Sequence, residues 1–375
     1  MYNKLLSVAT ILILLVTTFA ASQALSVNNM EELEEIEIKV AIYDSPIFRS
    51  PKNMNKALNY SWNIDDIKYT FKTTFISDKE IMGIGKNKLT NDNYDVLIIG
   101  AESRQFLINQ KMLFPNDREY LGLNSDRWIN NIKEFIANGG GYVGHCGGAN
   151  IASQGLLIKP DKASIFDILS LRIKHLGVAN IYVNDQQTEE WQYAWKIPLG
   201  NKETHVGVPI DLSVNQSHAI FNGYPYSLRN VLWFAGPSLL IGDAKDEMLG
   251  DIVPLAYYTE EPMEKAPLHM WRFNKPFYNI KTDINGQMAG IATVYNDSGR
   301  IVLFGPHSEY GTFTGGNFTE FRGFPRFPFY DNYYYTWVDV NPTPDDYNYW
   351  IFRRSVAWVT YIPDEALPPI EYIDW

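Results

Sequence analysis

The feature that most constrains the fold of this chain is the segment GGGYVGHCGG at residues 139–148. Its first half predicts a short strand, and a helix is expected to start at Ala149. A nucleophile flanked by glycines between a strand and a helix is typical of a nucleophile elbow, which is a sharp and strained turn. Gly144 and Gly148 would prevent clashes between the strand and the helix. The segment therefore predicts an α/β fold that holds Cys146 at the carboxyl end of a strand, where open sheets bind ligands.

Strands and helices are predicted to alternate around this segment. The run at 95–99 is apolar throughout, which is typical of a strand buried on both faces. Strands that alternate with helices imply a parallel sheet covered on both faces. We therefore expect one αβα domain over residues 36–362, with a mainly parallel sheet and an irregular insertion at about 160–290. Strands are predicted at 36–43, 69–76, 95–99, 141–144, 178–183, 210–214, 230–234 and 253–258, a hairpin at 291–304, and helices at 53–62, 126–137 and 347–360.

The first 24 residues predict a secretory leader. Lys4 precedes an almost wholly apolar run that ends at Ala21, and small residues precede a cleavage position after Ala24. This layout is typical of a signal peptide, and the alternative is an uncleaved N-terminal anchor, because the run approaches the length that spans a bilayer. Both interpretations place the rest of the chain outside the cytoplasm. An acidic linker is expected at 25–35 and a C-terminal tail at 363–375.

Composition excludes some classes of function. The formal net charge is −11, which disfavours binding to a nucleic-acid backbone. A membrane is expected as a partner only if the leader stays uncleaved. The histidines show no metal-ligand spacing, so no metal and no other cofactor is expected. Four sequons would permit N-glycosylation in a host that has the machinery, at Asn59, Asn215, Asn296 and Asn317.

Cys146 is the only cysteine in the chain, so it cannot form an internal disulfide. It is either an inert buried thiol or a reactive one, and the surrounding glycines favour the reactive interpretation. The N-terminus of a following helix favours a thiolate. The backbone N–H of Gly147 would be placed to bind an oxyanion. We therefore predict that Cys146 is a nucleophile.

A nucleophilic thiol needs a base, and the base needs a group that orients it. The segment GPHSEY at 305–310 follows the apolar run that ends at Phe304. A histidine and a glutamate two positions apart point to the same side of an extended segment. Glu309 would then accept from one imidazole nitrogen of His307 while the other nitrogen faces Cys146. Both residues could also be structural, or remnants of a former catalytic site.

These two motifs together carry a resemblance to the class I glutamine-amidotransferase-like superfamily, and most of all to its biotin-protein-ligase N-terminal-like group. The likeness runs over most of residues 36–362, in the segments GGGYVGHCGGAN (139–150), HAIFNGYP (218–225), VLWFAGPSLL (231–240), GRIVLFGPHSEY (299–310) and RRSVAWVTYI (353–362). The resemblance implies a flavodoxin-like three-layer fold, with Cys146 as nucleophile, His307 as base and Glu309 as orienting residue. In this superfamily a glycine-rich turn after the third strand supplies a second oxyanion donor, and Gly100 and Ala101 stand at that place.

Two functions of different classes follow from these observations. The first is a thiol hydrolase or amidase that acts outside the cytoplasm on an amide, either a small molecule or a peptide. The second is a non-catalytic ligand-binding or scaffold domain that keeps the fold. The sequence predicts no oligomeric state. An aromatic stretch at 311–345 is expected to be a long loop that packs over the sheet edge and walls the pocket, and the alternative is a sugar- or peptide-binding platform.

Overall fold

The computed structural model describes residues 34–44, 50–101, 125–157, 175–184, 197–198, 206–272, 275–322 and 333–372. The described chain falls into a small compact unit that includes 34–36 and 63–69, and a main unit that includes the rest. The main unit contains every candidate site residue. The predicted leader lies outside the described residues. Glu34 and Glu35, expected in the acidic linker, belong instead to the first strand.

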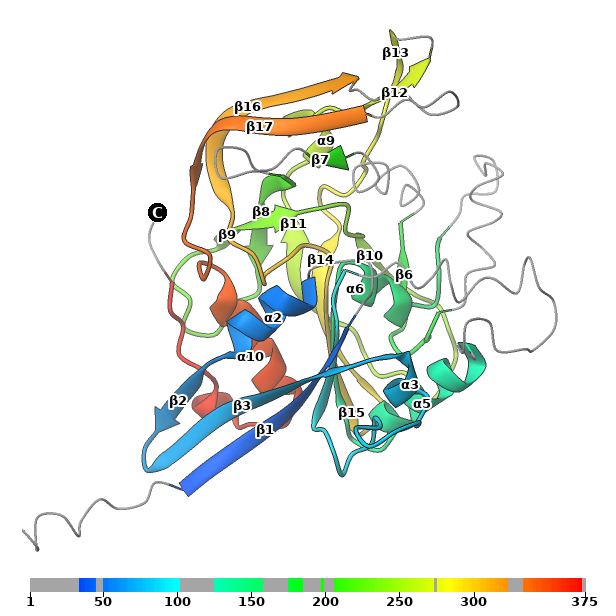
Figure 1. Cartoon of the computed structure of the whole chain (residues 1–375), viewed down its shortest axis with the longest axis vertical. Helices are drawn as coiled ribbons and strands as arrows, with labels where there is room; N and C mark the ends of the chain where they lie inside the picture. The colour runs from blue at the N-terminus through cyan, green and yellow to red at the C-terminus, as the bar shows by residue number, and fades with distance from the viewer. Residues whose placement is uncertain are drawn as a thin grey trace, which may run out of the picture. The chain divides into compact units, whose positions relative to one another are not determined.

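The main structural element is a mixed sheet of 12 strands (Figure 1). The strands lie in the order β2-β3-β1-β4-β5-β15-β14-β11-β8-β9, and β10 joins β14 to β6. Their bounds are β1 Glu34–Tyr43, β2 Ser61–Ile64, β3 Ile67–Ile76, β4 Val96–Ile99, β5 Gly141–His145, β6 Ile181–Val183, β8 Val208–Val214, β9 Leu228–Trp233, β10 Leu239–Ile241, β11 Val253–Tyr258, β14 Met288–Tyr295 and β15 Gly299–Phe304.

One part of this sheet is paired in parallel. β1 pairs with β4, β4 with β5, and β5 with β15, all in parallel. From β15 to β9 each neighbouring pair is antiparallel. The predicted α/β class is confirmed, but the expectation of a mainly parallel sheet is corrected to a mixed one. Strands joined by a tight hairpin, such as β14 and β15, can only be antiparallel neighbours.

Helices lie on both faces of the sheet (Figure 1). In β5, Tyr142 belongs to the buried cluster that contains Trp128 of α5. His145, on the other face of the same strand, contacts Phe352 of α10 with the ring centroids 5.1 Å apart. α2 contacts α10, and α6 packs on β4, β5 and β15. The helix bounds are α2 Ser50–Leu58, α3 Asp78–Ile81, α5 Ser125–Ala137, α6 Gly147–Ala152, α9 Pro262–Lys265 and α10 Tyr349–Val359.

Most predicted elements are found near their expected positions. The strand predicted at 253–258 is found with the same bounds, and the predicted hairpin is β14 and β15. The helix predicted at 53–62 is instead α2, which begins and ends earlier, and β2 follows it. The described part of the insertion is not irregular, because β8, β9 and β11 extend the main sheet. The C-terminal tail includes a 3-10 turn, Asp364–Ala366, and Leu367 after it is buried.

The aromatic stretch is not a loop. It forms β16 (Phe313–Arg322) and β17 (Tyr333–Pro342), which pair antiparallel and form a three-stranded sheet with β7 (Ile197–Pro198). Phe318 lies 5.4 Å from Trp337 between ring centroids. Cross-strand aromatic pairs of this kind stabilise a hairpin, which explains why the stretch forms two paired strands and not the expected loop. β12 (His269–Arg272) and β13 (Lys275–Asn279) form a further hairpin.

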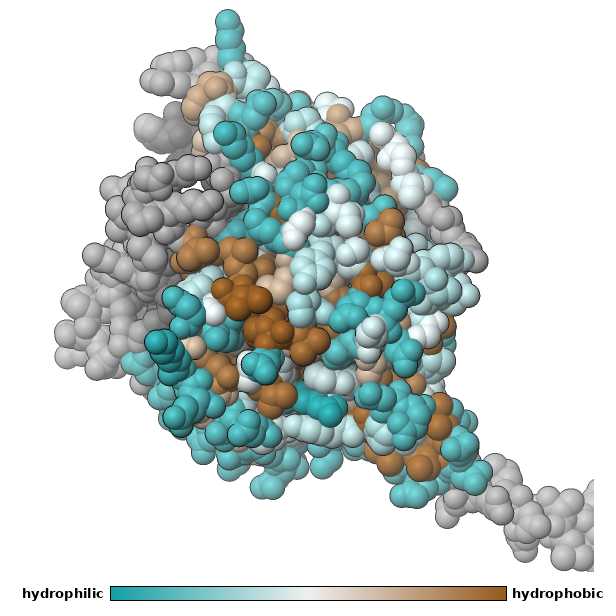
Figure 2. All heavy atoms as spheres, turned by 180° about the vertical axis from the view of Figure 1, so that it is seen from behind, coloured by the Kyte–Doolittle hydropathy of each residue, from teal (hydrophilic) through white to brown (hydrophobic). Residues whose placement is uncertain are grey.

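The described surface carries some exposed apolar side chains. Figure 2 shows that apolar residues gather in a patch on the face turned away from the viewer of Figure 1. The most exposed large apolar residue among those described is Ile241, at 69%. Within the described ranges, no helix has the length and hydrophobicity needed to cross a bilayer.

Candidate active site

Cys146 lies at a strained turn between β5 and α6. Its φ is 52° and its ψ is −110°, a backbone conformation that costs a residue with a side chain about 1–3 kcal/mol. A Cβ at Gly148 would lie 1.9 Å from the carbonyl oxygen of Ile99, and a Cβ at Gly144 would lie 2.7 Å from the backbone of Gly148. Only glycine allows the chain to pass this closely at both positions. The predicted elbow geometry is therefore present.

His307 and Glu309 follow β15 as a buried pair. The backbone N–H of His307 donates to Leu232 of β9 at 2.9 Å, which fixes the chain just beyond the strand. The imidazole Nδ1 lies 2.7 Å from Glu309 Oε1. His307 is 2% exposed and Glu309 is fully buried. The two side chains meet as the sequence predicted.

The charges in this buried pair are fixed by mutual attraction. Burial raises the pKa of Glu309, but the histidines His307 and His145 outweigh burial and hold that pKa well below its usual range. Burial lowers the pKa of His307, but Glu309 and Cys146 outweigh it and raise the pKa to about 10. Glu309 is therefore a carboxylate that accepts the Nδ1 proton of His307.

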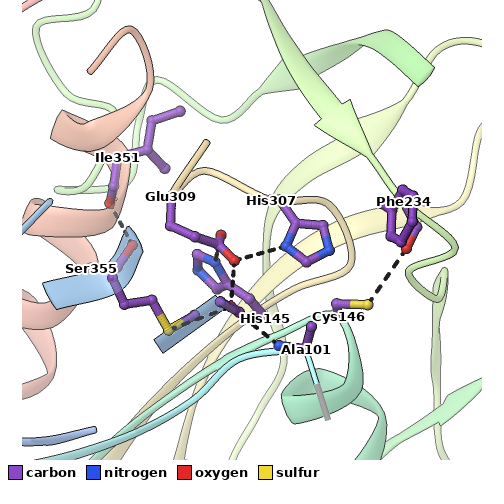
Figure 3. Close-up of polar contacts among 10 residues, drawn as sticks. Ala101, His145, Cys146, Phe234, His307, Glu309, Ile351 and Ser355 are labelled. Atoms are coloured by element: carbon purple, nitrogen blue, oxygen red, sulfur yellow. Dashed lines mark hydrogen bonds and ion pairs between the residues drawn. The ribbon is translucent and has the colours of Figure 1, made fainter. Parts of the chain in front are cut away.

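The second imidazole nitrogen of His307 is left for Cys146. Figure 3 shows the His307 ring between Glu309 and the cysteine. Nε2 of His307 is buried and has no hydrogen-bond partner among the described residues. The Cys146 sulfur lies 3.8 Å from the carbonyl oxygen of Phe234, to which the thiol donates weakly. A thiol, an imidazole and a carboxylate thus occur together, and one imidazole nitrogen has no hydrogen-bond partner among the described residues.

One of the two residues predicted to supply the second oxyanion donor makes a different contact. The carbonyl oxygen of Gly100 accepts from Gly148 N–H at 2.9 Å, so that carbonyl faces α6. The backbone N–H of Ala101 donates to Ser50 Oγ at 3.4 Å. Because its N–H is directed at Ser50, Ala101 does not serve as the expected donor in this arrangement. Gly147, the first residue of α6, follows Cys146 directly and keeps its predicted role as the first donor candidate.

Two residues near the pair were not identified as site residues from the sequence. Ser50 Oγ donates to Glu309 Oε1 at 2.9 Å, and His145 Nδ1 lies 2.8 Å from Glu309 Oε2. His145 is at the end of β5, and no local pattern in the sequence predicts its contact with Glu309. Ser50 starts α2 and is followed by Pro51, which marks a helix start but predicts no contact with Glu309.

The other described histidines form separate structural contacts. His269 Nδ1 lies 2.8 Å from Glu320 Oε2, and His175 Nδ1 lies 2.9 Å from the carbonyl oxygen of Asn150. In the part of the chain that the structure describes, no three histidine, cysteine or acidic side chains are grouped so that they could hold a metal ion.

Comparison with known proteins finds only distant similarities. No family model matches the chain, and no curated protein matches it. Among solved structures, it is similar to PurLQS from Thermotoga maritima, with 11% identity, a TM-score of 0.36, and 73% of this chain and 89% of that chain covered. It is also similar to the cytoplasmic protein STM3548 from Salmonella typhimurium, with 12% identity, a TM-score of 0.35, and 71% and 86% covered. At this level the likenesses carry no argument about function.

Proposed function

We propose that this chain is a cysteine-nucleophile hydrolase or amidase. The observation that carries the proposal is the buried His307–Glu309 pair, with Nε2 of His307 uncommitted beside the Cys146 elbow. A hydrogen-bonded carboxylate that fixes the imidazole tautomer is what a thiol or hydroxyl nucleophile needs in order to lose its proton.

The proposed reaction has two steps. His307, whose pKa is raised, holds the proton that the thiol gives up, and the sulfur of Cys146 attacks the carbonyl carbon of an amide. The N–H of Gly147 stabilises the resulting oxyanion. The imidazolium then gives its proton to the leaving amine as the carbon–nitrogen bond breaks, which leaves a thioester. His307 next activates a water molecule, which hydrolyses the thioester and restores the thiol.

The setting of this reaction is proposed from the sequence. We propose an exported protein whose substrate is a small-molecule or peptide amide outside the cytoplasm. We also propose that the fold has the layers expected of the glutamine-amidotransferase-like superfamily. Within that superfamily, we propose a likeness to the biotin-protein-ligase N-terminal-like group. An exported location argues against ammonia transfer, because free ammonia would be lost.

Alkylation of the single cysteine tests the proposal. Purified chain is treated with iodoacetamide at pH 6.5, and the modified fraction is followed by mass spectrometry. We expect Cys146 to react about tenfold or more faster than free cysteine, because the imidazole of His307 can hold the proton that the thiol gives up. His307→Gln should lower the rate to that of a free thiol.

The matched control is His269→Gln, which breaks a similar histidine–carboxylate contact elsewhere in the chain. It should leave the alkylation rate unchanged. A wild-type rate no higher than that of free cysteine would contradict the proposal. A screen for amide hydrolysis then identifies the substrate, and Cys146→Ser should abolish any turnover that is found.

A second candidate function has one observation in its favour. The Ala101 N–H, one of the two N–H groups expected to be the second oxyanion donor, donates to Ser50 instead. Losing one such donor typically slows acyl transfer by about 10²–10³. The chain would then be a ligand-binding domain that keeps the site. In that case a ligand should raise the melting temperature of wild type and Cys146→Ser equally, with no turnover in either.

A further inference from the structure

Glu309 is held by three donors, although a catalytic pair requires only one. Oε1 accepts from His307 Nδ1 at 2.7 Å and from Ser50 Oγ at 2.9 Å. Oε2 accepts from His145 Nδ1 at 2.8 Å. Figure 3 shows His145 and His307 approaching the same carboxylate. Each oxygen of the carboxylate is therefore anchored by a different histidine.

His145 is held for this contact by its surroundings. The side chain is fully buried, and its ring is enclosed by Phe304 at 5.8 Å and Phe352 at 5.1 Å between ring centroids. Its Nε2 has no hydrogen-bond partner in the described chain. The ring thus has an apolar environment except on the side where Nδ1 faces Glu309. A buried nitrogen without a partner costs free energy, so the contact with Glu309 is the polar interaction that offsets the burial of this ring.

We propose that His145 is a positioning residue for the Cys146 site. By anchoring Oε2, His145 prevents the Glu309 carboxylate from rotating, so that Oε1 stays directed at His307. His307 then keeps its proton on Nδ1 and its Nε2 toward Cys146. This inference rests on the proposed function, because it assigns a task to His145 only if the reactivity of Cys146 depends on His307. Groups that hold a reactive residue in place commonly matter in this way at functional sites.

The groups that could contribute to the pH dependence are few. Glu309 is faced by His145, His307 and the nearby Cys146, and Tyr310 stacks edge-on against His307 at 5.4 Å. α2 presents the uncharged Ser50, and α10 presents apolar side chains such as Phe352. A change in the pH profile after substitution of His145 therefore reports on this cluster.

The test compares substitutions that keep or remove the donor of His145. In His145→Asn, the side-chain amide nitrogen falls near the position of Nδ1 and can still donate to Glu309. In His145→Leu the donor is absent. We expect His145→Leu to lower the alkylation rate of Cys146 at pH 6.5 about tenfold and to move the midpoint of the rate–pH profile. His145→Asn should stay within about threefold of wild type and keep its midpoint.

Two controls separate this inference from stability and from the proposed function. His269→Leu removes the equivalent donor from Glu320 and should leave the profile unchanged. If His145→Leu does not fold, His145→Gln replaces it, because its amide nitrogen falls near the Nε2 position and misses Glu309. A wild-type profile in the folded donor-free variant overturns the role of His145 while leaving the proposed function intact. A slow wild-type rate instead overturns the proposed function itself.

Discussion

At the scale of single residues, the site is built by constraints that act over different distances along the chain. The glycines around Cys146 are needed within one turn of the chain, so their spacing predicts the elbow. His307 and Glu309 are two positions apart, so an extended segment brings them together. The contact of Ser50 with Glu309 exists only because α2 packs beside the site, and no local pattern encodes it.

The backbone strain at Cys146 can be measured by two substitutions. With φ at 52°, alanine keeps the strain, whereas glycine adopts that angle freely. We predict that Cys146→Gly is more stable than Cys146→Ala by about 1 kcal/mol, although glycine usually lowers stability. Urea denaturation of the two variants gives the difference. An alanine variant that is the more stable of the two would mean that the turn is not strained.

At the scale of elements, the position of a strand is easier to predict from the sequence than the strand with which it pairs. Alternation of strands with helices favoured a parallel sheet, but β8, β9 and β11 add antiparallel strands to it. Sequence periodicity gives the length of a strand and not its neighbour, so this addition could not be foreseen. The aromatic stretch was expected to be a loop because it is rich in glycine and proline. Its aromatic residues instead pair across β16 and β17.

The close approach of α6 to β4 predicts the cost of a single methyl group. Alanine at Gly148 would place its Cβ 1.9 Å from Ile99 O, so α6 would have to move away from β4. We predict that Gly148→Ala lowers the free energy of unfolding by about 3 kcal/mol or more, and slows alkylation of Cys146. Thermal and urea denaturation measure the first effect.

The control for this prediction is Gly286→Ala. Gly286 has a φ of +79°, and a Cβ at this position would meet no neighbouring atom within 4 Å, so alanine would suffer backbone strain without a clash. Its expected cost is about 1 kcal/mol. Equal losses at the two positions would mean that α6 adjusts easily, and that the glycine at 148 is not required by packing.

At the scale of the whole main unit, the site lies where the two parts of the sheet meet. Cys146 follows β5, which pairs in parallel with β15. Leu232, which accepts from the His307 backbone, belongs to β9, and Phe234, which contacts the cysteine sulfur, is the residue after β9. The antiparallel strands thus hold His307 through its backbone and face the cysteine sulfur. The sequence predicts the strand at 230–234 that forms most of β9, but it does not predict that this strand reaches His307 and Cys146.

Two partly buried histidines predict how stability depends on pH. Burial lowers the pKa of His175 and of His218 from the ordinary 6.5 to about 4. Between these values the unfolded chain binds protons at these two positions that the folded chain does not, so the two histidines lower the free energy of unfolding as pH falls from 6.5 toward 4. Measurement at pH 7 and pH 5 stays above the range where most carboxylates titrate. Between pH 7 and pH 5, each histidine should then lower the free energy of unfolding by about 1–2 kcal/mol.

Asparagine substitutions isolate this effect. His175→Asn keeps a donor near the Nδ1 position for the carbonyl of Asn150 but does not titrate. The loss of stability between pH 7 and pH 5, measured by urea denaturation with tryptophan fluorescence, should therefore be smaller in His175→Asn than in wild type by one histidine's share. The double variant with His175→Asn and His218→Asn should lose still less stability between pH 7 and pH 5. If wild type and the double variant lose the same amount, then both histidines are protonated in the folded chain, and the acid sensitivity has its origin in other groups.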